Sequence, residues 1–415
     1  MRMRLLLLIL LLSAGFCLPV MAADRINVTD YGAIPNDGQD DTAAINSAIN
    51  AGRSIYFPPG SYNYYSSIYV PANTSYRFYG DGPGVSTIVF TGNPYTGFYG
   101  YNMGSATLEI DGLTLKAGSK NCGTGIYALW NQAGANEKFR TAIIHNVQIV
   151  GSTRDGATGT YWTGGIYLNR AQNAVIDNVE INGNASDNET GASIATQFGI
   201  VWTADGYTTT GLQLSNIEVY FCNTGLQVNG SVEGVSATGF EFAFCGLANG
   251  VPAVDLSSNL PNLGSAFHLL NGHVGLLQNG VRLTNLRDAR ISNVFFLHPG
   301  GNDSARSGEH VTLNNCTDAV ISDSTFVGLE AIPGYSNYTD DTCIRLNNSH
   351  SVQVIGNYFT RVRPSGNGIG IAADSSNDTV RIINNVFESD GYGYGSVQQP
   401  YSIAAPGTYK RGNTL

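Results

Sequence analysis

Three carboxyl groups gather near the C-terminal end of the chain. Asp340 and Asp341 directly precede a short alternating run, and Glu309 begins the run before it. When the two runs are aligned as neighbouring strands, Glu309 lies next to the residue that follows the Asp pair. Cleavage of a glycosidic bond needs one protonated and one ionised carboxyl group, and adjacent carboxylates raise one another's pKa. The spacing therefore predicts a catalytic centre for glycoside cleavage.

Basic and imidazole side chains adjoin these acids. His310 follows Glu309, and Arg345 points outward from the strand that follows the Asp pair. Arg282 falls in the same outward row two repeats earlier. We expect His310 and Arg345 to belong to the catalytic centre and Arg282 to bind substrate. The alternative is that the acids only cap a turn or face solvent.

Aromatic residues occur in or beside the long segments between repeats. Because aromatic faces stack well on sugar rings, these residues are candidates for substrate binding. Ordinary loop packing is the alternative for each of them. The candidates are Tyr161, Trp162, Trp202, Tyr335 and Tyr338.

A repeated unit of roughly 30 residues positions all these candidates. Each copy is two alternating runs joined by a polar turn, and 13 positions separate a Leu of the first run from the apolar end of the second. No such unit buries its apolar face alone, so neighbours must stack to form the core. The clear copies run from Leu168 to Ile181, Leu283 to Phe296, Leu313 to Phe326 and Leu346 to Phe359.

The repeats predict an all-β fold, a right-handed single-stranded parallel β-helix of about ten coils. Asn recurs at the end of the first run, which indicates a structural ladder at a tight turn. Its members are Asn169, Asn229, Asn314 and Asn347. Almost all length variation lies between the repeats, so walls beside one strand face are expected at residues 151–164, 182–198, 243–265, 297–309 and 327–342.

Residues 1–22 are typical of an export signal. Arg2 and Arg4 precede an apolar run that is too short to span a membrane, and small residues end the segment. We therefore expect a secreted or periplasmic protein with no membrane partner. Five cysteines follow the signal, and Cys222 and Cys245 fall at equivalent positions of consecutive coils. A disulfide between them and a pair of buried thiols are both compatible with that spacing.

Composition limits the partners further. The net charge is −10, which argues against nucleic acid. No metal-binding or cofactor motif such as HExxH or paired CxxC occurs, so no cofactor and no metal site are expected, except calcium if the protein is a lyase. Monomer and trimer both remain open.

The N-terminal region contains the motifs NVTDYGA, DGQDDTAAINSAI and IYFPPGSY. An apolar face of Ile45, Ala48 and Ile49 predicts a helix over 41–50 that covers the first coil. These motifs resemble the opening of the pectate lyase-like superfamily of right-handed parallel β-helices, whose members include polygalacturonases, rhamnogalacturonan-active enzymes and tailspikes. The expected organisation is a signal at 1–22, a cap strand and helix at 23–62, the β-helix at 63–395 and a C-terminal cap or tail at 396–415.

The segment that begins at Asp340 is also similar to the Asp-Asp-Cys-Ile strand entry of polygalacturonases. That resemblance implies paired Asp residues acting in inverting hydrolysis. The chain departs from the pattern at Thr342, which is inserted before Cys343, and it lacks the Gly-His-Gly and Arg-x-Lys motifs. We expect an exported glycoside hydrolase acting on an acidic or neutral glycan. The alternatives are a polysaccharide lyase and a non-catalytic glycan-binding or adhesive β-helix.

Overall fold

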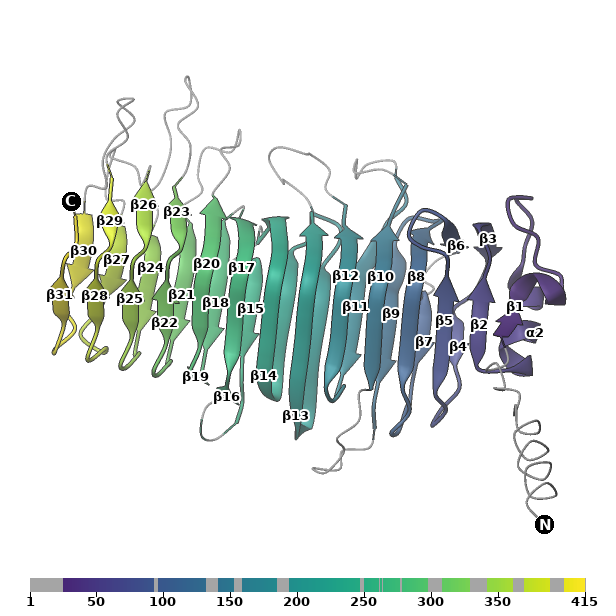
Figure 1. Cartoon of the computed structure of the whole chain (residues 1–415), viewed down its shortest axis with the longest axis horizontal. Coiled ribbons are helices and arrows are strands. Elements are labelled where there is room, and N and C mark those ends of the chain that lie inside the picture. Colours follow the sequence, from purple (N-terminus) through teal and green to yellow (C-terminus); the bar gives the residue numbers. More distant parts are fainter. Residues whose placement is uncertain are drawn as a thin grey trace, which may run out of the picture.

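The chain winds into a long solenoid of parallel strands (Figure 1). The computed structural model describes residues 25–92, 96–131, 141–152, 159–184, 194–246, 250–260, 262, 264–276, 278–297, 308–328, 342–360, 369–388 and 399–414. Within them, each coil pairs in register with the next, as in a right-handed single-stranded parallel β-helix of about ten coils. The predicted fold is therefore confirmed. The predicted export signal lies outside the described residues.

Three parallel sheets form the walls of the solenoid. The first contains β4 (Ile68–Val70), β7 (Phe98–Gly100), β9 (Cys122–Leu129), β11 (Trp162–Asn169), the first parts of β13 (Phe198–Tyr220) and β14 (Thr224–Cys245), β15 (Val254–Ser257), β18 (Asn279–Thr284), β21 (Glu309–Asn314), β24 (Thr342–Asn347), β27 (Ile369–Ala373) and β30 (Gln399–Ile403).

The second sheet contains β1 (Arg25–Asn27), β2 (Ser54–Phe57), β5 (Tyr76–Gly80), the first parts of β8 (Leu108–Ala117), β10 (Ala142–Val150), β12 (Ala174–Asn182), β17 (Phe267–Leu276) and β20 (Arg290–Leu297), the middle of β13 and β14, and β22 (Val320–Ser322), β25 (Gln353–Ile355), β28 (Arg381–Ile383) and β31 (Tyr409–Arg411).

The third sheet contains β3 (Gly60–Tyr64), β6 (Ser86–Phe90), β23 (Thr325–Val327), β26 (Tyr358–Thr360), β29 (Val386–Phe387) and the last parts of β8, β10, β12, β13, β14, β17 and β20. A separate two-stranded sheet pairs β16 (Gly264–Ser265) with β19 (Leu286–Arg287).

From Gly112 onward, the corner between the second and third sheets is a single left-handed residue in each coil. Left-handed backbone is tolerated best by Gly and next by Asn and Asp, and only these types occur there. Some of the Asn side chains also bond along the stack, as where Asn178 Nδ2 donates to Asn146 Oδ1 at 2.8 Å. The row is Gly112, Asn146, Asn178, Asn216, Gly239, Asn271, Asn293, Asp323, Gly356, Asn384 and Gly412, with φ between 51° and 68°.

The core is built from the same position of successive coils. Phe296, Phe326, Phe359 and Phe387 form a stack in which neighbouring ring centroids lie 4.6–4.9 Å apart and the rings are nearly parallel. The predicted Asn ladder is only partly formed. Asn347 Nδ2 donates to Asn314 Oδ1 at 2.8 Å, whereas Thr203 stands between Asn169 and Asn229 in the register.

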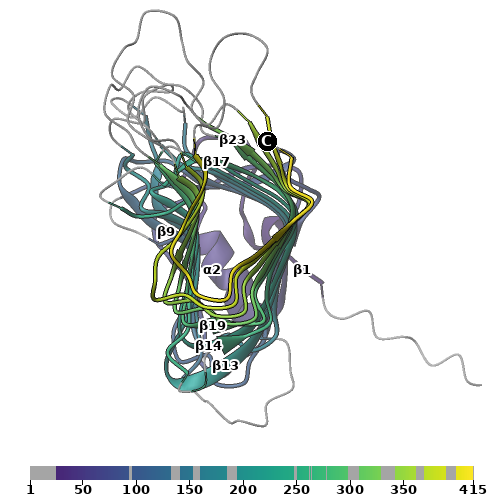
Figure 2. The ribbon, with the colours of Figure 1, turned by 90° about the vertical axis from the view of Figure 1, so that its left-hand side faces the viewer.

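A short cap closes the N-terminal end of the core. The 3-10 helix η1 (Val28–Tyr31) precedes α2 (Thr42–Ala51), which buries Ile45, Ala48 and Ile49 as predicted. Viewed along the solenoid axis, α2 lies inside the outline of the coils (Figure 2). Apolar burial on one face therefore fixes this helix as a cap.

The five cysteines of the described region are buried free thiols, so Cys222 and Cys245 form no disulfide. Burial raises the pKa of the Cys222 thiol. Among the described residues, no helix combines the length and apolarity needed to cross a bilayer.

Candidate functional site

An outward row on the first sheet contains the predicted arginines. We call it the first-sheet row, and residues aligned in it are neighbours in the strand register. Its members are Tyr69, Tyr99, Tyr127, Tyr167, Val201, Gln227, Asp255, Arg282, Thr312 and Arg345. The predicted placement of Arg282 and Arg345 in one row, with Thr312 between them, is confirmed.

Glu309 and Arg345 form an ion pair beside this row. Glu309 lies opposite Thr342 in the register, as predicted. Arg345 Nε donates to one oxygen of Glu309, and the Thr312 hydroxyl donates to the other. Arg345 also donates from Nη2 to the Thr342 hydroxyl at 3.2 Å. Glu309 is thus held in place by a guanidinium and two hydroxyl-bearing neighbours of the same surface, Thr312 directly and Thr342 through Arg345. Asp340 and Asp341 lie outside the described residues.

A second ion pair lies two coils nearer the N-terminus. Arg282 donates from Nε and Nη2 to the two oxygens of Asp255, at 3.0 and 2.6 Å, and from Nη1 to the Gly250 carbonyl at 3.1 Å. This bidentate pairing raises the pKa of the Arg282 guanidinium. Surface hollows of about 350 and 410 Å³ adjoin Arg282 and Arg345, respectively. The row therefore offers space for a ligand next to both arginines.

His310 does not reach this surface. The side chain is fully buried, its Nε2 lies 3.1 Å from the Val327 carbonyl, and its ring meets Phe296 and Phe326 edge to face. The prediction that His310 belongs to the catalytic centre is wrong, because a buried core ring cannot touch a substrate. His310 and the adjacent Val311 are both buried, so strict alternation does not hold at the start of β21.

The two tryptophans predicted to bind substrate are also core residues. Trp162 is 2% exposed and donates from Nε1 to the Leu115 carbonyl at 3.2 Å. Trp202 is fully buried and donates to the Ala171 carbonyl at 2.9 Å. Both predictions are wrong, and the sequence contained the reason. Each Trp lies an even number of positions from the inward-pointing Ile of its own strand, so the two side chains point to the same side.

The other predicted aromatic residues have separate outcomes. Tyr161 is half-buried at the surface, and its hydroxyl donates to Asn121 Oδ1. Its role in substrate binding stays a prediction. Tyr335 and Tyr338 lie outside the described residues.

A tyrosine ladder was not anticipated. The rings of Tyr99, Tyr127 and Tyr167 are stacked with centroids 5.3 and 5.0 Å apart, and Tyr69, 62% exposed, meets Tyr99 edge to face. Inside the stack the ring faces cover one another, so the phenol edges and hydroxyls face outward. Burial raises the pKa of Tyr127 and Tyr167, which keeps these hydroxyls protonated. The repeated Gly-Ile-Tyr at Tyr127 and Tyr167 was the sequence signal for it.

Glutamates of three consecutive coils form another row that was not anticipated, on the outer face of the third sheet. We call it the third-sheet row; its members are Gln148, Glu180, Glu218, Glu241, His273 and Phe295. Each Glu directly precedes the apolar end of its repeat: Glu180 before Ile181, Glu218 before Val219 and Glu241 before Phe242. That shared position was the signal that sequence reasoning passed over.

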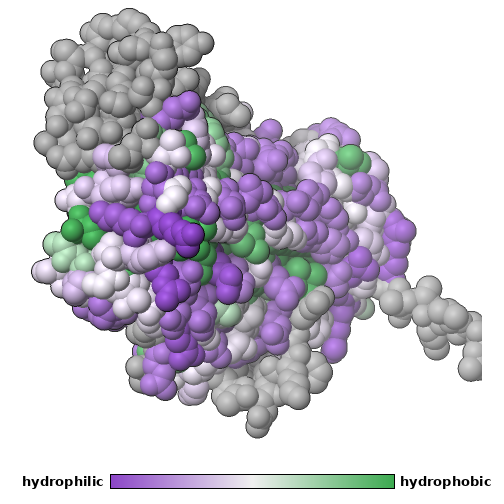
Figure 3. Space-filling model, turned by 60° about the vertical axis from the view of Figure 1, so that its left-hand side comes forward, coloured by the Kyte–Doolittle hydropathy of each residue, from purple (hydrophilic) through white to green (hydrophobic). Residues whose placement is uncertain are grey.

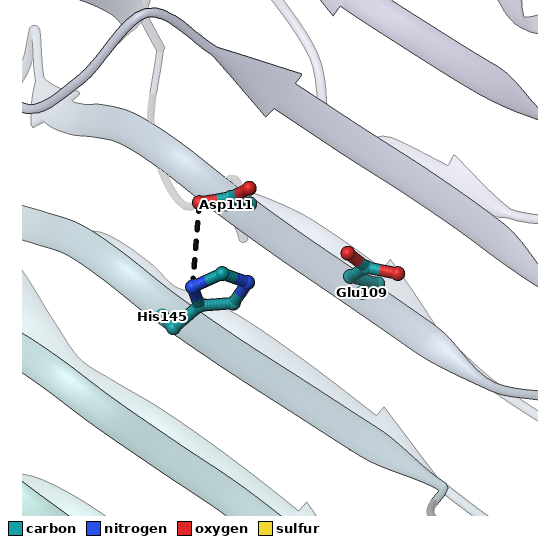
Figure 4. Close-up of side chains that lie close together, drawn as sticks. All are labelled: Glu109, Asp111 and His145. Carbon is teal, nitrogen blue, oxygen red and sulfur yellow. Dashed lines mark ion pairs between the residues drawn. The ribbon is translucent and has the colours of Figure 1, made fainter.

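One further cluster has the composition of a metal site. Glu109, Asp111 and His145 lie on β8 and β10 with ligand atoms within 4.8 Å of one another (Figure 4). Arg77, however, pairs with Glu109 at 2.9 Å and with Asp111 at 3.2 Å. An arginine already neutralises both carboxylates, so the cluster is explained as a surface ion-pair network and does not fit a cation.

The face of the molecule shown in Figure 3 is mainly hydrophilic where its residues are coloured, with hydrophobic residues in small separate patches. Such a surface lacks the large apolar area of an obligate protein interface.

Comparisons with known proteins agree with this architecture. The matching family model is described as "Rhamnogalacturonase A/epimerase, pectate lyase-like" and covers residues 25–250. No curated protein sequence matches the chain. The sequence identities to the solved structures are low, so likeness to one of them shows only that the fold is shared.

Several solved structures share this fold. Tailspike protein 2 from Escherichia coli O157:H7 bacteriophage CAB120 has a TM-score of 0.56 at 17% identity, over 81% of this chain and 43% of the tailspike. Gene product 12 of bacteriophage phi29, in its pre-mature form, has a TM-score of 0.52 at 13% identity, over 93% and 56%. The catalytic unit of a GH87 α-1,3-glucanase from Streptomyces thermodiastaticus strain HF3-3 has a TM-score of 0.50 at 14% identity, over 95% and 69%.

The chain spans less than half of the tailspike's length. The family model, in contrast, matches more than half of the chain and includes the cap, the tyrosine ladder and all three glutamates of the third-sheet row. The chain therefore belongs to the rhamnogalacturonase A/epimerase family of pectate lyase-like proteins.

Proposed function

We propose that the protein is an exported polysaccharide-cleaving enzyme, a glycoside hydrolase that binds an acidic or neutral glycan along the first-sheet row. The observation that carries the proposal is the change in chemistry along this row. Tyrosine hydroxyls occupy one half, and ion pairs with adjoining hollows occupy the other. An extended chain of sugars, with hydroxyl groups along its whole length, matches such an extended polar track.

The ion-paired half supplies the reacting groups in this proposal. Arg345 and Thr312 orient the carboxyl group of Glu309, which serves as the base that activates water. Asp340 or Asp341 acts as the acid, since Thr342 directly follows them and lies opposite Glu309. Free donors of Arg345 bind a substrate carboxylate if the glycan is acidic.

Export and partners belong to the same proposal. The N-terminal segment with Arg2 and Arg4 directs the chain out of the cytoplasm, and the substrate is a polysaccharide met there. No cofactor is required for hydrolysis by carboxyl groups. A lyase would instead remove a proton α to a uronate carboxylate, and calcium would be its expected ion.

The test is a screen of purified full-length protein against rhamnogalacturonan, polygalacturonate and α-1,3-glucan. Reducing ends report hydrolysis, and unsaturated-uronate absorbance reports elimination. We expect new reducing ends without absorbance, and a loss of turnover by about two orders of magnitude or more in Asp340→Asn or Asp341→Asn. Absorbance would identify a lyase. Binding without either product would identify a non-catalytic glycan-binding protein.

A further inference from the structure

We propose a second glycoside-cleaving centre on the outer face of the third sheet, in which Glu218 and Glu241 act as a carboxyl pair of the retaining kind. It rests on the proposed substrate class, a polysaccharide, but uses no residue of the first-sheet row. The two sites lie on different sheets of the solenoid and can be disabled separately.

The geometry of the pair is the first support. Glu218 and Glu241 are direct register partners on β13 and β14, and neighbouring strands lie about 4.8 Å apart. One hydroxyl lies between them: Tyr220 Oη is 3.3 Å from an oxygen of Glu218 and 3.0 Å from an oxygen of Glu241. Retaining glycosidases need carboxyl groups about 5–5.5 Å apart, whereas inverting enzymes need about 6.5–9.5 Å. Because one hydroxyl lies within 3.3 Å of both carboxyl groups, the two oxygens that it contacts are closer together than the inverting range, and we assign the pair to the retaining kind.

The hydrogen-bond count is the second support. Tyr220 has one hydroxyl hydrogen, and burial together with the two carboxylates raises its pKa. The phenol thus stays protonated, but it can donate to only one carboxylate at a time. The two contacts therefore share one hydrogen, and both carboxyl groups are drawn to the same point. Glycoside cleavage by retention requires two carboxyl groups close together, one as acid and one as nucleophile, and the shared phenol holds two such groups side by side.

Electrostatics along the row is the third support. Like charges directly opposite one another on neighbouring strands are destabilising, yet three glutamates occupy consecutive coils. Glu180 is satisfied by the amides of Gln148 and Asn182. Glu241 faces His273, whose Nδ1 lies 3.1 Å from its Oε1. Glu218 and Glu241 share the Tyr220 hydroxyl. The fold therefore keeps two adjacent like charges, although apolar or amide residues in their place would cost no stability.

The surroundings suit a sugar. A hollow of about 610 Å³ opens over the pair, within the usual size of small-molecule sites. Phe295, 42% exposed, lies in this hollow with its ring centroid 5.5 Å from that of His273. An exposed aromatic face beside carboxyl groups offers a stacking surface for a pyranose ring. The remaining polar lining comes from Asn216, Asn271, Asn293, Asp323 and Thr325.

The reaction follows from these contacts. Glu241, which faces His273, attacks the anomeric carbon as a carboxylate and forms a glycosyl ester, while the bond from that carbon to the leaving oxygen breaks. Glu218 gives its proton to the leaving oxygen. Water then attacks the same carbon, gives a proton to Glu218 and releases Glu241 as a carboxylate. Two displacements restore the original anomeric configuration.

The test uses the full chain and two probes. The first is a set of 2-deoxy-2-fluoro glycosyl fluorides of glucose, galactose and mannose, which trap a glycosyl ester and are read by intact and peptide mass. The second is the polysaccharide panel above, with the anomeric configuration of the first product read by proton NMR. The variants are Glu241→Gln, Glu218→Gln and Glu309→Gln, with Glu180→Gln as the matched control in the same row.

We expect a trapped ester on Glu241 in the wild type, in Glu309→Gln and in Glu180→Gln, and none in Glu241→Gln. Formation of the retained product should fall by about a hundredfold or more in Glu218→Gln and Glu241→Gln. Absence of both an ester and a retained product in the wild type overturns the second centre. If inverted product still forms and Glu309→Gln abolishes it, the first-sheet proposal stands alone. If neither the wild type nor any variant reacts with either probe, both proposals fail.

Discussion

The outer rows of the first and third sheets show two ways of placing carboxylates on one solenoid. On the first sheet, Asp255 in the row and Glu309 beside it each meet an arginine of a neighbouring coil. In the third-sheet row, Glu218 and Glu241 meet each other across a single phenol. The strand register is equally regular in both places. The difference therefore lies in side-chain pairing: the first row compensates its charges, and the third row leaves like charges adjacent.

This difference has consequences for stability and for chemistry. An ion pair on the first sheet fixes the position of its carboxylate beside a guanidinium, which suits an oriented base. Adjacent carboxylates favour one shared proton, which suits an acid and a nucleophile together. Sites that carry out chemistry commonly retain such unfavourable contacts, because function and not stability selects them. The two rows should accordingly respond in opposite ways to loss of charge.

The largest expected effect is on turnover by the first row. Glu309→Gln should lower the formation of product with inverted configuration by about a hundredfold or more, because the amide cannot accept the proton of the attacking water. The rate is measured as initial reducing ends on the glycan that the wild type cleaves, with the anomer read by NMR. Arg345→Lys is the companion variant and should lose less. Normal inverted product from Glu309→Gln would remove this residue from the catalytic centre.

The cap helix gives the largest expected effect on stability, and it should affect both rows alike. Ile45→Asp places an unpaired charge where α2 meets the first coil, so the free energy of unfolding should fall by about 2 kcal/mol or more. Chemical denaturation followed by circular dichroism measures the change. Ala43→Asp is the matched control on the exposed first turn, where a negative charge is tolerated. Equal stability of the two variants would show that α2 does not cap the core.

A smaller effect separates the two rows directly. Arg282→Met leaves Asp255 without its bidentate partner and should lower the free energy of unfolding by about 1 kcal/mol. Glu218→Gln removes a like charge beside Glu241 and should leave stability unchanged or raise it slightly. Both changes should shrink at high salt, because screening weakens surface charge effects. Destabilisation by Glu218→Gln would show that the third-sheet row is stabilising after all.

Most of the fold could be predicted from the sequence because each coil repeats the same inward positions. The stack of Phe296, Phe326, Phe359 and Phe387 and the buried face of α2 follow directly from apolar periodicity. The register between neighbouring coils was also predictable where repeats were clear. The alignment of Glu309 with Thr342 is an example.

The sites were harder to predict for two physical reasons. Alternation tells which side of a strand a residue occupies, but it does not tell which residues meet across coils. Glu180, Glu218, Glu241 and His273 are separated by 38, 23 and 32 residues, because the connections between coils differ in length. The row therefore becomes visible only when the coils are superimposed. The tryptophans were assigned to walls because they flank long connections, although their phase with Ile166 and Ile200 places them inside.

The smallest effect concerns two basic side chains that are neighbours on the second sheet, which lies between the sheets that carry the two rows. His268 lies opposite Arg290 in the register. Burial first, and the charge of Arg290 second, lower the pKa of His268 below its ordinary value, and Asp288 opposes the shift. The unfolded chain therefore binds more protons than the folded chain as the pH falls through about 6.5, and folding stability falls with it.

Proton NMR of the imidazole should show a pKa below 6.5, and Arg290→Met should raise it toward that value. His268→Asn should remove the loss of stability on acidification that comes from His268. The free energy of unfolding in urea should then differ less between pH 7.5 and pH 5 than it does in the wild type. A pKa at or above 6.5 in the folded chain would mean that His268 is solvated and that Arg290 does not repel its protonated form.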